Sequence, residues 1–325
     1  MKLRRFGRTD MRVSELAFGG GRSGGILINA DDDTRRAAVR RALDLGVNWF
    51  DTAPQYGDGK SEDALGWLLA EVPETPFVST KVRIDITSSE SLISQVERSV
   101  TESLARLKRD QVDLLQIHSL IMPEASGRTI SVDHVLRDGG MADAMEKLRD
   151  QGMTRFLGLT ALGDNKSTIE VIKSGRFDGA QIYYNVINPS SAWDSLVSGW
   201  SSYDGSGIMA ACQEQDMAVM AIRIFAASYL ATPERTGRES ILTANTQAAT
   251  EIHNAEAVFA TLDGEHGTRA QIAVRFALSN EAVSTAIVGL SESAHLEEAA
   301  AGADKGSLSA DAMAKLDQLY KTGFE

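Results

Sequence analysis

The chain has 325 residues, of which 43% are hydrophobic and 24% charged, so it can bury a large core and is neither disordered nor fibrous. Its 45 acidic and 33 basic residues give a formal net charge of −12, which argues against a nucleic acid or an anionic membrane as partner. The one cysteine, Cys212, excludes an intrachain disulfide and a metal site built on thiolates, and it favours a reducing, cytoplasmic setting. No stretch approaches the ~18 apolar residues of a membrane span, and no secretory leader is recognisable. We therefore expect a soluble protein whose partners are small molecules.

The amino-terminal residues predict a short β-hairpin followed by the first strand and helix. Runs at 3–6 and 12–14 flank the turn residues 7–10, which is typical of a hairpin. A strand at 15–18 then runs into three glycines at 19–21, and from Asp31 apolar residues recur at helical spacing until Gly46. Residues 15–46 are therefore predicted to form a strand, a glycine-rich loop and a helix that ends at a glycine.

The same unit repeats along the chain. Further strands are predicted at 47–50, 77–80, 112–117, 155–159, 179–183, 218–222 and 285–288, each followed by a helical pattern; after 47–50 and 77–80 the helices are expected from Ser61 and Ser88. Short, nearly all-apolar strands that alternate with helices imply a parallel sheet covered on its outside, and eight units close into a (β/α)₈ TIM barrel. A doubly wound open sheet is the alternative, but residues 19–24 lack the glycine spacing of a dinucleotide-binding loop. No linker interrupts the pattern, so residues 1–325 are expected to form a single domain.

Three connections, after the fourth, sixth and seventh barrel strands, are unusually long. They span residues 119–140, 185–205 and 225–267. Connections that follow barrel strands lie over the mouth where active sites sit, so these are candidate substrate walls, or alternatively tolerated surface insertions.

Ionisable side chains stand at the carboxyl ends of three successive strands: Asp51, Lys81 and His118. A barrel aims them at one mouth, and Tyr56 follows Asp51 closely enough to join them. A phenol with a pKa of about 10 is a poor acid at neutral pH unless an ammonium group eases its proton transfer. Lys81 is placed to supply that charge, Asp51 to hold Lys81, and His118 to orient a carbonyl or share the proton of Tyr56. Singly, each residue is equally compatible with a solvated rim group or a cap; together they predict an acid–base couple without metal.

Several segments resemble the aldo-keto reductase family. They are Asn-Trp-Phe-Asp-Thr-Ala-Pro-Gln-Tyr-Gly at 48–57, Ser-Glu at 61–62, Ser-Thr-Lys-Val at 79–82, Asp-Leu-Leu-Gln-Ile-His at 113–118 and Gly-Arg-Thr at 7–9. The resemblance runs from about Leu3 to about Ala300 and is nearest to bacterial sugar (aldose or fucose) dehydrogenase-like members. It implies hydride transfer between a nicotinamide cofactor and a carbonyl or alcohol, with Tyr56 as general acid in reduction and general base in oxidation.

The resemblance also assigns cofactor-binding positions. Gln181 matches the residue that bonds the nicotinamide carboxamide, Thr160 stands where serine is frequent, and Ala161 departs from the usual asparagine. Ile222 takes the place of a stacking aromatic residue. Arg223 beside it is expected to reach the pyrophosphate or to form a salt bridge at the rim.

The end of the last strand and the helix after it resemble the family's adenosine site. The candidate residues there are Gly289, Ser291, His295 and Glu298. Members that prefer the 2′-phosphorylated cofactor usually carry Lys or Arg here, but residues 287–304 contain neither. A 2′-phosphate would meet the acidic residues of this helix without a cation, so the sequence predicts NAD(H), with NADP(H) as the alternative.

Aromatic residues in the long connections, among them Trp193, Phe225 and Tyr229, are expected either to stack on a sugar or ring ketone or to pack the loops onto the barrel. Two other functions remain open at this point. One is a barrel aldolase with Lys81 as Schiff-base nucleophile, and the other is a redox-sensing module that binds cofactor with negligible turnover. The sequence leaves the substrate, the favoured direction and the oligomeric state undetermined.

Overall fold

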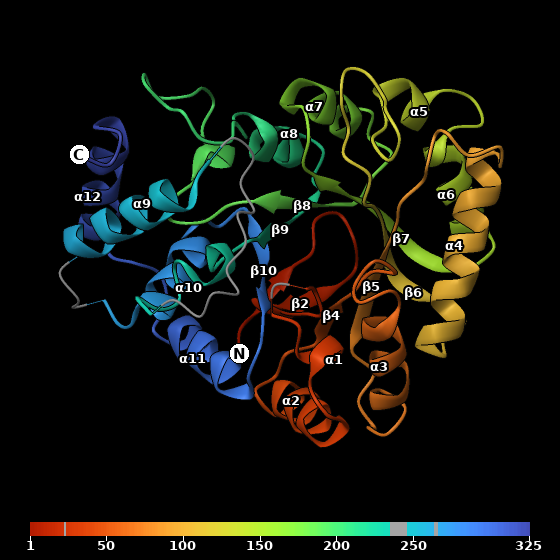
Figure 1. The fold of residues 1–325 in the computed structure, drawn as a ribbon, viewed down its shortest axis with the longest axis horizontal. Helices are drawn as coiled ribbons and strands as arrows, with labels where there is room; N and C mark the ends of the chain where they lie inside the picture. Colours follow the sequence, from red (N-terminus) through yellow and green to blue (C-terminus); the bar gives the residue numbers. More distant parts are fainter. Residues whose placement is uncertain (23, 235–245, 263–265) are drawn as a thin grey trace.

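The computed structural model describes residues 1–22, 24–234, 246–262 and 266–325. Within them the eight predicted strands form a closed parallel barrel with helices around it (Figure 1). In barrel order the strands are β10 (Val283–Gly289), β3 (Leu16–Gly19), β4 (Trp49–Asp51), β5 (Phe77–Val82), β6 (Val112–Ile117), β7 (Thr154–Ala161), β8 (Gly179–Tyr183) and β9 (Ala218–Ile222). Because β10 pairs with both β3 and β9, the sheet has no edge there. The barrel prediction is confirmed, and the open sheet is excluded.

Alternate residues of each strand point into the barrel, and this period of two builds its interior in layers. At the amino-terminal end the interior is apolar, with Trp49, Leu114, Met220 and Ala17 in one buried cluster. Two residues further along β4, the inward position is Asp51, and two further along β6 from Leu114 it is Gln116; both side chains are buried. The polar layer of the barrel therefore lies above an apolar floor.

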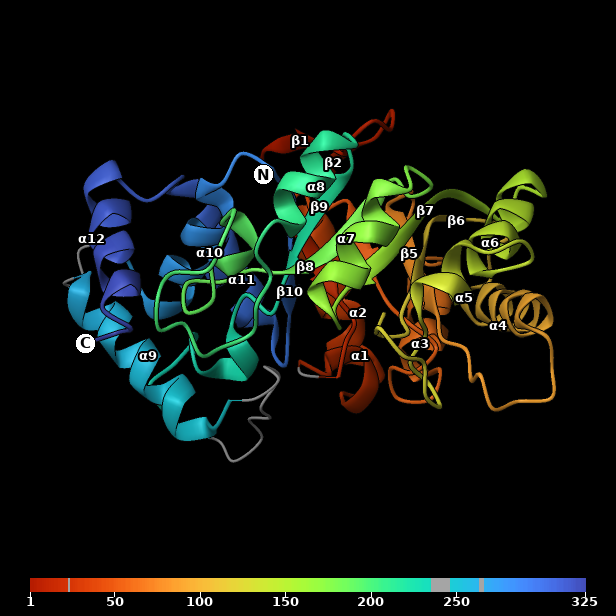
Figure 2. The same ribbon diagram turned by 90° about the horizontal axis from the view of Figure 1, so that it is seen from above.

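The predicted hairpin closes the amino-terminal end of this barrel. It consists of β1 (Leu3–Arg5) and β2 (Arg12–Ser14), paired antiparallel, and Figure 2 shows it at one end of the strands. Phe6 is fully buried and its ring stacks on Trp49 with centroids 4.7 Å apart. Gly7 has φ of +52°, and a Cβ there would lie 2.4 Å from the backbone nitrogen of Ala218, so only glycine fits this turn.

Helices surround the strands. In chain order they are α1 (Ile26–Asn29), α2 (Asp32–Asp44), α3 (Lys60–Leu68), α4 (Leu92–Leu107), α5 (Val132–Leu136), α6 (Met141–Asp150), α7 (Asn165–Lys173), α8 (Ile208–Glu214), α9 (Ala248–Thr261), α10 (Arg269–Ser279), α11 (Ser293–Asp304) and α12 (Ala310–Lys321). No described helix is long and apolar enough to cross a membrane. The expectation that a helix starts at Ser88 is wrong by about a turn, because the side chain of Ser91 accepts the backbone N–H of Ser94 and caps α4 there.

The long connections carry helices of their own. The connection at 119–140 contains α5, and the one at 225–267 contains α9. Figures 1 and 2 both place α9 beside the carboxy-terminal α12 at one flank of the molecule, opposite α4 and α6. These segments therefore build structure beside the barrel as well as over its mouth.

Candidate active site

A buried ion pair joins the ends of β4 and β5. The Nζ of Lys81 lies 2.6 Å from Oδ2 of Asp51 and donates a second hydrogen bond of 2.8 Å to the carbonyl of Thr52. Lys81 is 1% exposed and Asp51 3% exposed. Burial alone would lower the pKa of Lys81, but the carboxylate of Asp51 and the nearby Tyr56 raise it to a net value above its ordinary one. Lys81 therefore stays protonated.

The other oxygen of Asp51 is held by side chains from three further positions of the barrel interior. Its Oδ1 accepts hydrogen bonds from Ser79 Oγ at 2.7 Å, Gln181 Nε2 at 2.7 Å and Gln116 Nε2 at 3.2 Å. The sequence analysis missed Ser79 and Gln116. A signal was present. Ser79 lies two residues before Lys81 on β5, and Gln116 lies two residues before His118, which directly follows β6, so each shares the inward face of its strand.

Tyr56 lies on the turn after β4, directly above this pair. Lys81 Nζ is 4.7 Å from the centre of the Tyr56 ring, and the His118 ring meets it edge-on with centroids 5.8 Å apart. Burial raises the pKa of Tyr56, while the positive charge of Lys81 acts in the opposite direction. The four residues predicted to meet at the mouth are thus together in one cluster.

His118 is neutral in this cluster. Its Nδ1 lies 2.9 Å from Oε1 of Gln55, which fixes the ring. Burial, with repulsion from the charges of Lys81 and Arg83, lowers the pKa of His118 to about 2. Gln55 is a further residue that the sequence analysis did not single out, although it belongs to the quoted segment at 48–57.

The candidate nicotinamide positions lie on the neighbouring strands. Thr160, near the end of β7, is 4% exposed, and its Oγ1 is buried without a hydrogen-bond partner. An unpaired buried hydroxyl is costly, and a ligand amide would satisfy it.

The other candidate cofactor residues lie on β8 and β9. Gln181 donates its Nε2 hydrogen bond to Asp51. Ile222 ends β9, and the guanidinium of Arg223 lies 4.9 Å from the centre of the Tyr183 ring, where burial lowers its pKa.

The candidate adenosine positions lie where β10 ends and α11 begins. Ser291 Oγ and His295 Nδ1 are 3.2 Å apart, and Glu298 accepts a hydrogen bond from Thr268. Gly289, the last residue of β10, is exposed. The neighbouring Glu297 pairs with Arg41 of α2 at 2.7 Å. A cation thus reaches α11 from a distant helix, which the local sequence did not reveal.

The candidate substrate aromatics lie in loop packing. Trp193 meets Trp200 edge-on at 5.0 Å and Tyr320 of α12 at 5.8 Å. Tyr229 is 5% exposed, and Phe225 packs partly buried against the main core. Their contact with a substrate remains a prediction.

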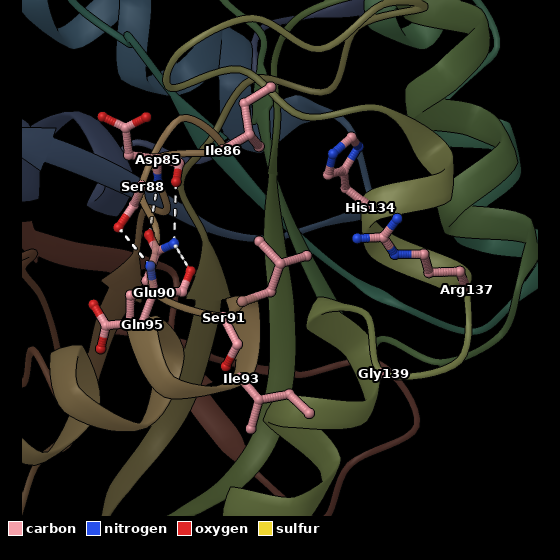
Figure 3. Close-up of a pocket in the computed structure, with 11 residues that line it drawn as sticks. Asp85, Ile86, Ser88, Glu90, Ser91, Ile93, Gln95, His134, Arg137 and Gly139 are labelled. Atoms are coloured by element: carbon pink, nitrogen blue, oxygen red, sulfur yellow. Dashed lines mark hydrogen bonds between the residues drawn. The ribbon is translucent and has the colours of Figure 1, made fainter.

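A separate pocket of about 330 Å³ lies at the start of α4, facing α5 (Figure 3). Its lining includes none of the four clustered residues. Gln95 on one wall donates to the carbonyls of Asp85 and Glu90, and His134 on the other lies 2.8 Å from Ser131 Oγ. The described residues also contain no group of three or more His, Cys, Asp or Glu side chains that could hold a metal ion.

The structure is a closed parallel barrel whose amino-terminal end is covered by a hairpin. At the other end, a Lys–Asp ion pair lies beneath a tyrosine. These features together are those of a barrel enzyme. Residues 15–321 match the family model described as "Aldo/keto reductase family". The chain belongs to this family of oxidoreductases, which confirms the resemblance stated above.

Similar proteins agree with this assignment. The chain is 28% identical over 304 residues to L-galactose dehydrogenase of Arabidopsis thaliana, covering 92% of this chain and 86% of the relative. It is 24% identical over 257 residues to D-threo-aldose 1-dehydrogenase of a Pseudomonas species, covering 70% and 71%. An aldo-keto reductase from Bacillus halodurans in its holo form superimposes with a TM-score of 0.76 at 21% identity, over 98% of this chain and 96% of that one, which shows the shared fold.

Proposed function

We propose that this protein transfers hydride between a nicotinamide cofactor and the carbonyl or alcohol group of a small substrate such as a sugar, an aldehyde or a ring ketone. The observation that carries the proposal is the Lys81–Asp51 pair, 2.6 Å long and buried, beneath the ring of Tyr56. The two sugar dehydrogenases among the similar proteins support a sugar or aldehyde as substrate.

Tyr56 is the proposed acid and base. In reduction its hydroxyl gives a proton to the carbonyl oxygen, and in oxidation its phenolate takes the proton of the alcohol. Lys81 stabilises that phenolate, and Asp51 holds Lys81 charged and in place. Neutral His118 orients the substrate oxygen beside Tyr56.

The cofactor would be held by the remaining half of the mouth. Thr160 offers its unpaired Oγ1 to the nicotinamide carboxamide, Ile222 an apolar contact, and Gly289, Ser291 and His295 the adenosine position. When bound, the nicotinamide supplies or accepts the hydride. Arg223 is the proposed pyrophosphate contact.

The aldolase alternative lacks support. A Schiff-base lysine must lose its proton to attack a carbonyl, but the pKa of Lys81 is raised above its ordinary value by Asp51 and Tyr56 in spite of burial. A redox-sensing module would show little turnover, so repeated turnover of a simple aldehyde decides against it.

The first test replaces the proposed acid. Tyr56→Phe should lower the rate of carbonyl reduction by the ~10²–10⁴-fold typical of a lost proton donor while cofactor affinity stays unchanged. Reduction is followed by the absorbance of the reduced cofactor, and affinity by its fluorescence on titration. Near-normal turnover in this variant would refute the role of Tyr56.

We also propose a preference for NAD(H). Residues 287–304 contain no Lys or Arg, and Arg41, which reaches α11 from α2, is held by Glu297 at 2.7 Å. A 2′-phosphate near pH 7 carries nearly two negative charges and would lack a free cation there. kcat/KM should be higher with NAD(H), and Ser291→Arg should move the ratio towards NADP(H). An advantage for NADP(H) in the unaltered protein would contradict the charge argument.

A further inference from the structure

The barrel mouth of this acidic protein carries arginines without partners. Among the described arginines, those whose side chains form neither a hydrogen bond nor an ion pair with protein atoms are Arg22, Arg83, Arg128 and Arg223. Each follows a barrel strand: β3, β5, β6 and β9 respectively. Elsewhere arginines are paired even on exposed faces, as Arg40 is with Asp44 and Glu74. Among the described residues, the arginines without a hydrogen bond or ion pair therefore all lie in connections that follow barrel strands.

Arg83 and Arg128 belong to the half of the mouth that carries Tyr56. Arg83 lies two residues after Lys81, and Arg128 lies in the connection after the strand that ends before His118. The pyrophosphate and adenosine positions proposed for the cofactor are on β9 and β10, opposite β5 and β6 in the barrel, whereas Thr160 on β7 lies next to β6. An anion bound by Arg83 and Arg128 would therefore belong to the substrate.

Backbone hydrogen bonds hold the two arginine-bearing loops together. The N–H of Ile86 donates to the carbonyl of Gly127 at 2.9 Å, and the N–H of Ile84 donates to Ser119 Oγ at 3.3 Å. Arg83 precedes Ile84, and Arg128 follows Gly127, so each of these hydrogen bonds lies next to one of the two arginines in the chain. The site is built from two loops rather than from one mobile side chain.

The charges of these two arginines act on each other and on the cluster. Burial, and after it the charge of Arg128, lowers the pKa of Arg83. The charge of Arg83 in turn contributes to the lowered pKa of His118. Asp85 is the carboxylate in electrostatic reach of Arg128; hydrogen bonds from Thr87 lower its pKa most, and the charge of Arg128 adds to this. No ion pair joins Asp85 to Arg128. An anion from a ligand would therefore meet two guanidinium groups that form no ion pair with the protein.

We propose that Arg83 and Arg128 form a binding site for an anionic group, a carboxylate or a phosphate ester, on the carbonyl or alcohol substrate that reacts at Tyr56. This inference rests on the proposed function and specifies its substrate class. Planar guanidinium groups bind both anions through paired hydrogen bonds. The half-buried Arg83 and the exposed Arg128 also offset repulsion from the net negative charge of the protein.

The test compares matched aldehydes. One pair is 4-carboxybenzaldehyde and 4-carbamoylbenzaldehyde, and the other is glyceraldehyde 3-phosphate and glyceraldehyde. In at least one pair, kcat/KM for the anionic aldehyde divided by kcat/KM for the neutral one should exceed one. The pair with this ratio shows whether the site prefers a carboxylate or a phosphate. Arg83→Gln and Arg128→Gln should each lower that ratio about tenfold, the loss of roughly one charge-assisted contact. Arg83→Lys should restore part of it, and added salt should lower it in the unaltered protein.

The matched control is Arg137→Gln, which removes one positive charge from the same region but from a residue that pairs with Asp133 at 3.2 Å. Its ratio should equal that of the unaltered protein. Equal ratios in all proteins, or the same loss in this control, would overturn the inference while turnover of the neutral aldehydes keeps the proposed function standing.

Binding without turnover separates the two claims further. In calorimetric titrations, 4-(hydroxymethyl)benzoate or glycerol 3-phosphate should bind the cofactor complex at least about tenfold more tightly than 4-(hydroxymethyl)benzamide or glycerol, and the double variant should lose this difference. If neither anion binds more tightly than its neutral counterpart, the inference is wrong whatever the activity measurements show. If anions bind but no carbonyl is reduced, the proposed function fails instead.

Discussion

At the scale of single residues, the site pairs nearly every buried polar atom, and the exceptions are informative. Asp51 receives four side-chain hydrogen bonds or ion-pair contacts, from Ser79, Lys81, Gln116 and Gln181. On the barrel strands, the buried side-chain atoms without a hydrogen-bond partner are Gln116 Oε1 on β6, Thr160 Oγ1 on β7 and Thr285 Oγ1 on β10. A buried unpaired hydroxyl destabilises a folded protein, so it persists more readily where a ligand completes it.

This contrast gives a residue-scale prediction. Thr160→Val should leave the free energy of unfolding without cofactor unchanged or raise it by up to about 1 kcal/mol, because an unsatisfied hydroxyl is removed. The same variant should bind the cofactor several-fold more weakly, by about the worth of one neutral hydrogen bond. Urea denaturation and fluorescence titration measure the two effects.

Thr285→Val is the matched control for that prediction. It removes the other unpaired strand hydroxyl, and we expect the same effect on stability with unchanged cofactor affinity. An equal loss of affinity in both variants would remove Thr160 from the cofactor site.

At the scale of elements, the amino-terminal hairpin is linked to the site through the barrel floor. Phe6 stacks on Trp49, the indole N–H of Trp49 donates to Ser79 Oγ at 3.0 Å, and Ser79 in turn donates to Asp51. The hairpin therefore supports the layer on which the carboxylate rests.

Deleting the stacked ring tests this support. Phe6→Ala should lower the free energy of unfolding by about 3–5 kcal/mol, since Phe6 is fully buried and leaves a cavity under Trp49. Leu3→Ala, on the same hairpin but 49% exposed, should change it by less than about 0.5 kcal/mol. Denaturant titrations compare the two, and similar losses would show that the hairpin does not act through the floor.

At the scale of the whole molecule, stability depends on pH through His118. Its pKa falls to about 2 in the folded protein, from about 6.5 in an unfolded chain. Between these values the unfolded chain binds a proton that the folded protein does not, so folding stability falls as the pH is lowered from 6.5 towards 2. Above about pH 6.5 the imidazole is neutral in both the folded protein and the unfolded chain, so His118 no longer makes folding stability depend on pH.

The corresponding prediction is a slope. The free energy of unfolding should fall by about 1 kcal/mol per pH unit more in the unaltered protein than in His118→Asn between pH 6 and 4. Denaturation at several pH values measures this, and NMR of the imidazole should show no protonation above pH 4. Parallel slopes in the two proteins would place His118 in a solvated environment.

The architecture and the clustering of the four candidate residues were predictable from the sequence because their signals are local. Apolar strands that alternate with helices imply a closed parallel barrel, and the carboxyl ends of such strands converge. Asp51, Lys81 and His118 stand at three successive strand ends, and Tyr56 follows the first of them by five residues, so their meeting needed no knowledge of register. Helix starts were less certain, as at Ser91, because a capping hydrogen bond decides among several nearby serines.

Contacts between residues distant in the chain were decided only by the tertiary structure. The register of parallel strands brings Gln116 and Gln181 to Asp51, and the packing of α2 on α11 brings Arg41 to Glu297. A backbone hydrogen bond from Ile86 to Gly127 joins the loop of Arg83 to that of Arg128. The packing of α12 against the connection after β8 likewise gives Trp193 its partner in Tyr320. The barrel and the meeting of Asp51, Tyr56, Lys81 and His118 followed from the sequence alone, because the period of the strands and the positions of their ends are local features of the sequence. The structure decided how the charges around them are paired, because pairing depends on which distant segments the closed barrel brings into contact.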